Sequence, residues 1–553
     1  MPRTRSPGRG RPAGNRKSLP DVNRRIFMAS GAATFVAATD AARAMTPRAS
    51  LRDKLATRSE SSNYLQASSM KDVAAFLNAL DQRGAPIARG SLGRTHGGYD
   101  IPYVVASRPM VRTPAEARAL NRPIVYLQAT THGGEVEGKE ALLSILRDLC
   151  LATDKTLLDD LVLLVVPVYN PDGNEALGPQ ARNRPEQNGP ERVGTRENGL
   201  GIDLATDYVR VAAPETRGAF EFLRAWQPDV FIDLRCEAGS FHDFGVTYAP
   251  SLHPAAYYGG TLARDGVLPT VRKELHDKFG VETFFCGGFG RTRALFAPPA
   301  PSDPDFAWYP CDYRPRYATN YMGLRGRVAL LVNAYAHDPF ERRVYTTRAF
   351  VESALGYCSD NDDRILANSR TASHWIGGPV PIRAGLPARA TSHESIEYEN
   401  LAVSSERREP GLPAGYQRTG TYARADVPVF DRYVGTLYVK EPVAYLVPYE
   451  YAKGLAPYLR THGIAHRALV SAERFTVQEF SIERIDRGGI AGRYRPPRSF
   501  ATKFGALYVV GGQPVGTLLS VLMEPQSDDG FFASGVFDPF VRPGTIAPVL
   551  RVV

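Results

Sequence analysis

The sequence contains few cysteines, no long apolar run after residue 45 and little excess charge over most of its length. The five cysteines include no C-x-x-C pair, which argues against a cysteine-based zinc site; they are Cys150, Cys236, Cys286, Cys311 and Cys358. An odd number leaves at least one cysteine unpaired or shared between chains, and the sequence does not give the pairing. No run after residue 45 reaches ~18 consecutive apolar residues, so we expect no membrane span there.

The formal charge of +9 is concentrated at the N-terminus. Residues 1–25 hold eight Lys and Arg residues against Asp21 alone, a net charge of +7, while Asp40 and Arg43 cancel within residues 26–44. Residues 45–553 therefore carry only about +2, which argues against nucleic acid or an acidic membrane surface as a partner.

The basic N-terminus is followed by features in the order of an export signal. In residues 23–45, NRRIFMASGAATFVAATDAARAM, the pair Arg24-Arg25 precedes a weakly apolar stretch that ends at Ala42-Arg43-Ala44. This order resembles a twin-arginine signal with an A-x-A cleavage site, and a basic tail followed by a helix is the alternative. We expect residues 1–44 to be a signal peptide and the mature protein to be periplasmic or extracellular.

Length and composition are those of a globular protein with two or three domains: 553 residues, 43% hydrophobic and 23% charged. Apolar segments alternate with helical patterns. We expect strands within residues 122–134, 161–173, 229–235 and 326–336, and helices over 69–84, 135–149 and 214–227. This alternation predicts an α/β fold with a mostly parallel sheet covered by helices. His132, Asn170, Arg235 and Asn333 fall at the carboxyl ends of the expected strands, where such sheets bind ligands.

The character of the sequence changes near residue 365. Short alternating segments rich in Gly, Pro, Tyr and Val, such as residues 433–451 and 505–525, predict a smaller strand-rich domain with one clear helix over 453–469. The expected organisation is therefore a signal peptide (1–44), an α/β domain (45–365) and a strand-rich C-terminal domain (366–553).

His132 and Glu135 stand in H-x-x-E spacing after an expected strand, in QATTHGGEVEGKEAL. Imidazole and carboxylate at this spacing can hold one zinc ion from the same side. The spacing alone also suits a loop histidine next to a helix N-terminus, where Glu135 would be favoured by the helix dipole. Three further segments follow in order: VPVYNPDGNE at 166–175, NRPEQNG and GTRENGLGIDLATDY at 183–208, and GLRGRVALLVNAYAHDPFERRV at 323–344.

This ordered series resembles the zinc carboxypeptidases, the carboxypeptidase A-like metallopeptidases, over roughly residues 65–360, and most of all a bacterial branch with an added C-terminal domain. The resemblance implies a mixed eight-stranded α/β sheet, a bound zinc ion and removal of a C-terminal residue from a peptide. In that family a zinc-bound water attacks the carbonyl and a glutamate acts as general base.

Carried over by position, the resemblance assigns His132 and Glu135 to the first two zinc ligands. The third ligand, a histidine in the family, falls on Arg235, and the glutamate base falls on Asn333. The Asn-Arg pair that grips the terminal carboxylate falls on Ala205 and Thr206. Arg196 matches the arginine that polarises the scissile carbonyl.

These departures remove three functions. An arginine cannot ligate zinc, and its charge opposes a divalent ion, so Arg235 is expected to pair with Glu135 near the zinc position. Asn333 cannot accept a proton at neutral pH, and Ala205 and Thr206 cannot clamp a carboxylate.

Several nearby residues are candidates to replace the missing zinc ligand or the missing base. His242 as a substitute ligand competes with a plain core or surface histidine. Cys236 is expected on the opposite face of the strand, and Glu237 on the face of Arg235, where it pairs with that arginine. Asp172 and Asp207 offer carboxylates but are expected to cap turns or be solvated.

Two functions follow. The first is an exported, catalytically degenerate carboxypeptidase-like protein, with zinc absent or weakly bound, that binds peptides or cell-wall fragments. The alternative is an active zinc metallocarboxypeptidase with altered ligation, supported by His132, Glu135 and the segment 170–173.

Overall fold

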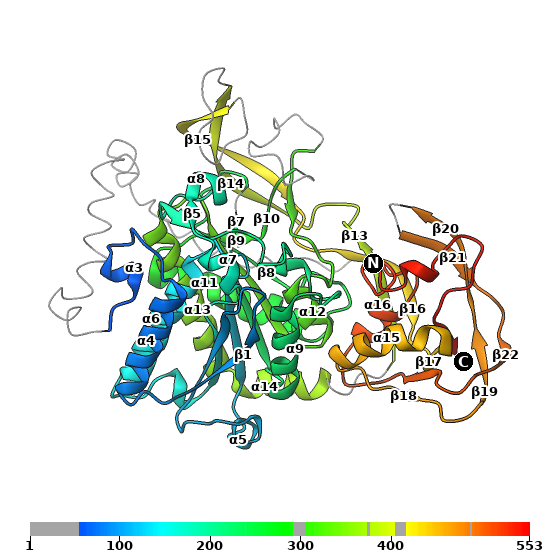
Figure 1. Cartoon of the computed structure of the whole chain (residues 1–553). Coiled ribbons are helices and arrows are strands. Elements are labelled where there is room, and N and C mark those ends of the chain that lie inside the picture. The colour runs from blue at the N-terminus through cyan, green and yellow to red at the C-terminus, as the bar shows by residue number, and fades with distance from the viewer. Residues whose placement is uncertain (1–54, 238, 291–304, 373–376, 404–415, 487–488) are drawn as a thin grey trace, which may run out of the picture. The chain divides into compact units, whose positions relative to one another are not determined.

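The structure is a computed structural model that describes residues 55–237, 239–290, 305–372, 377–403, 416–486 and 489–553 (Figure 1). The segment Thr57–Val553 forms one compact unit. The expected signal peptide lies outside the described residues, so export stays a prediction. Within the described ranges, no helix combines the length and apolar character needed to cross a membrane.

A mixed eight-stranded sheet carries, at its strand ends, the motifs identified in the sequence. Its strand order is β1 (Ile87–Arg94), β2 (Asp100–Ala106), β4 (Val162–Val166), β3 (Ile124–Ala129), β7 (Val230–Glu237), β12 (Val328–Tyr335), β8 (Val246–Pro250) and β9 (Thr283–Phe285). The pairs β4–β3, β3–β7, β7–β12 and β8–β9 are parallel, and the other three pairs are antiparallel. The predicted mixed, mostly parallel sheet is confirmed. Every residue of β3 and β4 is buried, as their continuous apolar character predicts.

Helices cover both faces of this sheet. On one face the rings of Tyr126 and Phe231 stack 5.2 Å apart in the same hydrophobic core as α9 (Pro214–Trp226). On the other face α6 (Glu137–Leu151) approaches so closely that a Cβ at Gly138 would lie 3.0 Å from the Cβ atoms of Ala129 and Leu234. α13 (Phe340–Asp360) packs against α6 and β12. The α/β layering therefore follows from strands that are apolar on both faces.

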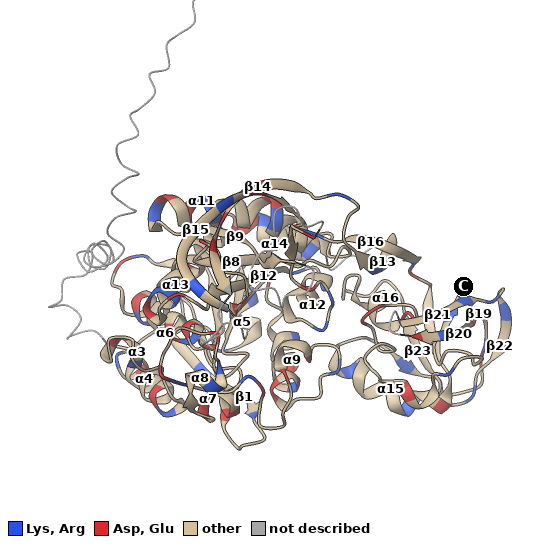
Figure 2. Cartoon of the chain, turned by 90° about the horizontal axis from the view of Figure 1, so that it is seen from above, with Lys and Arg blue, Asp and Glu red and all other residues tan. Residues whose placement is uncertain are grey.

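Local signals place the other helices. α4 (Met70–Gln82) begins where Ser69 caps it: the Ser69 hydroxyl accepts from the Asp72 amide at 3.2 Å, and the Asp72 carboxylate accepts from the Ser69 amide at 2.9 Å. The region also contains α3 (Arg58–Ser61), α5 (Pro114–Ala119), α11 (Leu268–Phe279), α12 (Ala318–Leu324) and α14 (Asp362–Ala372). Figure 2 shows basic and acidic residues interspersed on α11, where Lys273 pairs with Asp277 four residues on.

Residues 170–173, Asn-Pro-Asp-Gly, have a composition typical of a turn, but they start a short helix, α7 (Pro171–Glu175). Asn170 caps this helix by accepting from the Gly173 amide at 2.8 Å, and Pro171 occupies the first helical position. Proline and an asparagine cap favour a helix start as much as a turn.

Residues 377–553 are rich in strands, as predicted. They contain β13 (Pro379–Gly385), β14 (Ser392–Val403), β15 (Tyr416–Val429), β16 (Val434–Lys440), β17 (Ala444–Val447), β18 (Arg467–Ala468), β19 (Arg474–Gln478), β20 (Phe480–Asp486), β21 (Gly489–Tyr494), β22 (Arg498–Ala501), β23 (Leu507–Val510) and β24 (Leu550–Val552). Six of these strands form one sheet in the order β18-β23-β17-β24-β19-β22.

Two helices in this region differ from the sequence-based expectation. α15 (Tyr449–Thr461) is displaced toward the N-terminus from the expected range 453–469. α16 (Leu518–Met523) replaces an expected strand; all six of its residues are buried, so the sequence lacks the alternation that separates helix from strand. α14 runs across the expected boundary at residue 365, and one hydrophobic core holds residues from both sides of it, such as Tyr321 and Leu459. The division into two domains stays a prediction.

Candidate functional site

Three glycine-containing motifs meet at the carboxyl end of the sheet. A Cβ at Gly133 would overlap the backbone of Gly173, and a Cβ at Gly194 would overlap the carbonyl oxygen of Gly173. The chain also turns out of β3 at Thr130 with a positive φ of 58°, which is uncommon for a β-branched residue. Backbones this close require glycine, so three motifs that are far apart in sequence form one base for the site.

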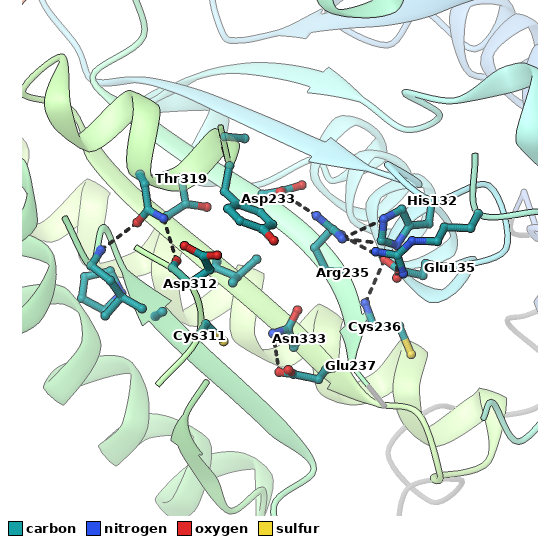
Figure 3. A pocket seen from close by; sticks show the side chains of 18 of the residues that line it. His132, Glu135, Asp233, Arg235, Cys236, Glu237, Cys311, Asp312, Thr319 and Asn333 are labelled. Atoms are coloured by element: carbon teal, nitrogen blue, oxygen red, sulfur yellow. Dashed lines mark hydrogen bonds and ion pairs between the residues drawn. The ribbon is translucent and has the colours of Figure 1, made fainter. Parts of the chain in front are cut away.

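A pocket of about 190 Å³ lies above this base. Five of the seven residues predicted for the site line it: His132, Glu135, Arg196, Arg235 and Asn333. β7 and β12 run parallel with Arg235 opposite Asn333, so both side chains enter the same pocket (Figure 3). The structure therefore brings most of the predicted residues together, while their roles stay predictions.

Glu135 is the centre of a buried ionic network. Its side chain is 2% exposed. One carboxylate oxygen lies 2.6 Å from His132 Nδ1 and accepts from Arg184 Nη2 at 3.2 Å; the other accepts from Arg235 Nε and from the Cys236 amide, both at 3.1 Å. Burial alone would raise the pKa of Glu135, but His132, Arg235 and Arg184 outweigh it and hold that pKa well below its usual range. Glu135 is therefore a fully bonded carboxylate, and the expected pair with Arg235 is present.

The Arg235 guanidinium lies over the face of the His132 ring. Its Nη2 is 3.2 Å from both ring nitrogens. A donor equidistant from two nitrogens that flank one carbon cannot lie in the ring plane without colliding with that carbon, so Nη2 lies above one face of the ring. Burial lowers the pKa of Arg235, but Glu135 and then Asp233, whose carboxylate is 3.6 Å away, raise it further than burial lowers it. The arginine is thus held in place as a permanent cation.

Asp203 closes the other side of His132. Its carboxylate lies 3.0 Å from His132 Nε2 and accepts from Arg196 Nη2 at 2.9 Å. Burial opposes ionisation of Asp203, but the hydrogen bond with His132 and the charges of His132 and Arg196 lower its pKa overall. Asp203 also accepts from the Ala205 amide at 3.0 Å, and its carbonyl accepts from the Thr206 hydroxyl at 3.2 Å. Ala205 and Thr206 are thus bound to the turn and are not among the lining residues of the pocket that the structure describes.

Asn333 faces a carboxylate and a sulfur. Its Nδ2 donates to Glu237 Oε2 at 2.8 Å and lies 3.1 Å from the sulfur of Cys286. Cys286 forms a disulfide with Cys311, and Cys150, Cys236 and Cys358 are free and buried. Glu237 accepts from the Asn333 amide, and its expected pairing with Arg235 stays a prediction.

The residues in place of a family zinc site do not fit the ion. Zinc takes at least three protein ligands, and the third position is an arginine with no lone pair to donate. Both nitrogens of His132 and both oxygens of Glu135 already face hydrogen-bond partners. A unit charge about 4 Å from another of the same sign costs about 4 kcal/mol at an effective dielectric near 20, and zinc carries two charges.

Sequence reasoning missed Arg184 and Asp203 as members of the site. Both lie inside motifs that the sequence analysis singled out, NRPEQNG and GIDLATDY. Their partner is set by the fold: Arg184 reaches Glu135 across 49 residues and Asp203 reaches His132 across 71. Only the loop packing at Gly133 and Gly194 brings them within reach.

The candidates to replace the missing ligand or base, His242, Asp172 and Asp207, are all buried. His242 is buried, with its ring 4.4 Å from that of Tyr335, and burial lowers its pKa to about 3. Asp172 accepts from Thr95 at 2.5 Å and from the Gly97 amide, and Asp207 accepts from the amides of residues 212 and 213 at 2.9 Å. These two carboxylates bind loops as expected, but they are buried rather than solvated.

Parts of the chain are similar to known proteins. Residues 73–236 match the family model described as zinc carboxypeptidase. Human carboxypeptidase D is 29% identical over 180 residues, which cover 31% of this chain and 12% of that protein. Carboxypeptidase 2 of Trichophyton tonsurans is 22% identical over 499 residues, which cover 83% of this chain and 81% of that protein.

Among solved structures, a metallo-carboxypeptidase from Burkholderia cenocepacia is 18% identical, with a TM-score of 0.38 over 53% of this chain and 69% of that chain. The match to human carboxypeptidase D spans little more than a tenth of that protein. Residues 73–236, which contain His132, Glu135 and Arg235, are therefore similar to the zinc carboxypeptidase family.

Proposed function

We propose that this zinc carboxypeptidase-like chain is an exported protein that binds peptides, or peptide fragments of the cell wall, without cutting them. The observation that carries the proposal is the position of Arg235, whose guanidinium lies within 3.2 Å of both His132 and Glu135. A fixed positive charge there opposes a divalent ion between the two donors. The peptidase reaction would lose the activated water that the metal supplies.

The catalytic and clamping positions support the same proposal. Asn333 donates its amide to Glu237 and has no proton acceptor of useful basicity, whereas general acid–base assistance is typically worth ~10²–10⁴-fold in rate. Ala205 offers only a methyl group where a carboxylate clamp would be needed. Three separate requirements of carboxypeptidase chemistry therefore lack the residues that would meet them.

The pocket retains a group that a ligand could satisfy. Thr319, on α12, lines the pocket and is only 5% exposed. Its hydroxyl has no hydrogen-bond partner among the described residues. Buried polar groups are rarely left unpaired, so a hydrogen-bonding ligand such as a peptide suits this wall.

One observation favours the alternative, an active metallocarboxypeptidase with altered ligation. Glu237 places a carboxylate 2.8 Å from the Asn333 amide, close to where a general base would act. This alternative still requires Arg235 to leave His132 and Glu135 so that a metal can enter.

The proposal is tested on mature protein whose Cys286–Cys311 bridge is intact. We expect substoichiometric zinc by mass spectrometry, no change in metal content in His132→Ala, and retention of uncut peptides from a library passed over immobilised protein. Stoichiometric zinc that His132→Ala removes, together with release of C-terminal residues, would establish the alternative.

Thr319 provides a matched pair of variants for the test of peptide binding. Thr319→Val removes the hydroxyl and keeps the shape, so the Kd of a retained peptide should rise about 2- to 10-fold. Thr319→Ser keeps the hydroxyl and should bind nearly as the parent does. Equal binding by both variants would remove Thr319 from the ligand site.

Arg235→His separates metal binding from catalysis. This change supplies a third ligand, a second imidazole nitrogen beside His132 and Glu135, so we expect zinc uptake, but Asn333 still provides no base and cleavage should remain absent. Measurable cleavage by this single variant would show that another residue, with Glu237 the first to examine, acts as the base.

A further inference from the structure

A second set of metal-binding groups lies in the same pocket, on β7 and the segments next to it. Glu237, Cys286 and Cys311 hold their ligand atoms within 4.8 Å of one another, the one such group of three found among the described residues. Glu237 Oε2 is 3.3 Å from the sulfur of Cys286, and the Cα atoms of the two cysteines are 5.6 Å apart. Figure 3 shows Glu237, Asn333 and Cys311 separated from the His132–Glu135–Arg235 network.

We propose that reduction of the Cys286–Cys311 bond converts this group into a binding site for a thiophilic divalent cation such as Zn²⁺ or Co²⁺. A dithiol reductant breaks the sulfur–sulfur bond, delivers two electrons and two protons, and becomes a disulfide itself. The cation then binds both sulfurs as thiolates, releases the two thiol protons to solvent, and takes the Glu237 carboxylate as third ligand. Two thiolates and a carboxylate are ligands that zinc accepts at structural and catalytic sites.

The surroundings of the three ligands suit a metal site. The Asn333 amide donates to Glu237 at 2.8 Å and lies 3.1 Å from the Cys286 sulfur, and the Thr247 hydroxyl donates to Glu237 at 3.5 Å. Such donors orient ligands and stabilise their negative charge. An amide at position 333 therefore suits this site better than a carboxylate, which would repel the two thiolates.

The site would keep one coordination position toward the pocket. Glu237 and Cys311 both line the pocket, whereas Cys286 is 1% exposed and lies behind them. A tetrahedral ion with three protein ligands leaves its fourth position for water or for a ligand group such as a carboxylate. The sequence concealed this possibility because the two cysteines are 25 residues apart and form no short motif.

The inference does not rest on the proposed peptide-binding function, since neither His132 nor Glu135 takes part. The test uses the mature chain, reduced with a dithiol under anaerobic conditions, freed of reductant and titrated with Co²⁺ alone. We expect one Co²⁺ per chain with the absorption of cobalt–thiolate charge transfer. Protein with the bridge intact should show no such band.

Variants locate the ion. Cys286→Ser should abolish the cobalt–thiolate band of the reduced chain, and Glu237→Gln should weaken Co²⁺ binding by ~10-fold or more. Cys358→Ser, which removes a different buried cysteine, should leave the titration unchanged. His132→Ala should also leave it unchanged, which separates this site from the one discussed under the proposed function.

Three outcomes would overturn the inference. One is a reduced, folded chain that takes up no Co²⁺; another is uptake that Cys286→Ser leaves unchanged. The third is loss of the fold on reduction, followed by circular dichroism, that Zn²⁺ or Co²⁺ does not reverse.

Discussion

At the scale of single residues, Glu135 and Arg235 depend on each other. Glu135 is buried among two arginines and a histidine, and Arg235 spans Glu135 and Asp233. A buried charge that loses a partner is costly, whereas the same pair exposed to water contributes little. The contribution of each ion pair to stability is therefore expected to depend on whether the pair is buried, rather than on how many pairs the network contains.

Arg235→Met tests this dependence. The change keeps much of the side-chain volume but leaves one oxygen of Glu135 with the Cys236 amide alone among its donors here, so we expect the free energy of unfolding to fall by about 3 kcal/mol. Arg196→Met is the matched control, because its side chain is 48% exposed and should lose less than about 1 kcal/mol. Urea unfolding of the two variants measures the difference, and similar losses would contradict the argument.

The sequence predicts the residue-scale pairing only in part. The pairing of Arg235 with Glu135 could be predicted from the sequence, because the end of an expected strand and the H-x-x-E loop both map to the zinc position of the family. Asp203 could not, because nothing in GIDLATDY states that its partner lies 71 residues earlier. A salt bridge between distant segments is decided by how close their backbones come.

At the scale of elements, the short helix α7 joins the loops that hold the site. The Asn170 side chain caps α7 through Gly173 and donates to the carbonyl oxygens of Thr131 and Arg196, each at 3.3 Å. One amide thus connects the loop that bears His132 with the loop that bears Arg196. The sequence identified Asn170 as the end of a strand but not as a bridge between loops.

Asn170→Ala should destabilise this arrangement by about 1–2 kcal/mol, since a cap and two further hydrogen bonds are lost. Asn170→Asp keeps the capping oxygen but places a buried carboxylate oxygen against the two carbonyl oxygens, so its loss should be at least as large as that of alanine. Thermal unfolding followed by circular dichroism ranks the three proteins. Equal stability of Asn170→Ala and the parent would show that the loops are held without this bridge.

At the scale of the whole molecule, buried histidines make the fold sensitive to acid. Burial lowers the pKa of His253 and His462 to about 3, and of His337 to about 4, below the ordinary value of 6.5. His462 lies between distant segments, with one ring nitrogen 2.8 Å from the Tyr321 hydroxyl and the other 3.1 Å from the Val209 carbonyl. The folded protein therefore resists protonation that the unfolded chain accepts.

The sign of the pH dependence follows from these directions. Above pH 6.5 neither state binds the proton, so the full stability is present; as the pH falls from 6.5 toward 3, each such histidine removes up to about 1.4 kcal/mol per pH unit. His462→Gln should make the decline of unfolding free energy between pH 7.5 and 5.5 shallower. A parent protein whose stability does not fall over this range would contradict the prediction.

The sequence by itself determined the α/β order, the helix within residues 69–84 and the resemblance to the zinc carboxypeptidases, because apolar periodicity and spaced motifs are local signals. Only the tertiary structure decided that α16 is a helix, that Arg184 and Asp203 join the site, and that Cys286 and Cys311 meet beside Glu237. The physical reason is that these features depend on contacts between segments tens to hundreds of residues apart, whose geometry no local pattern records.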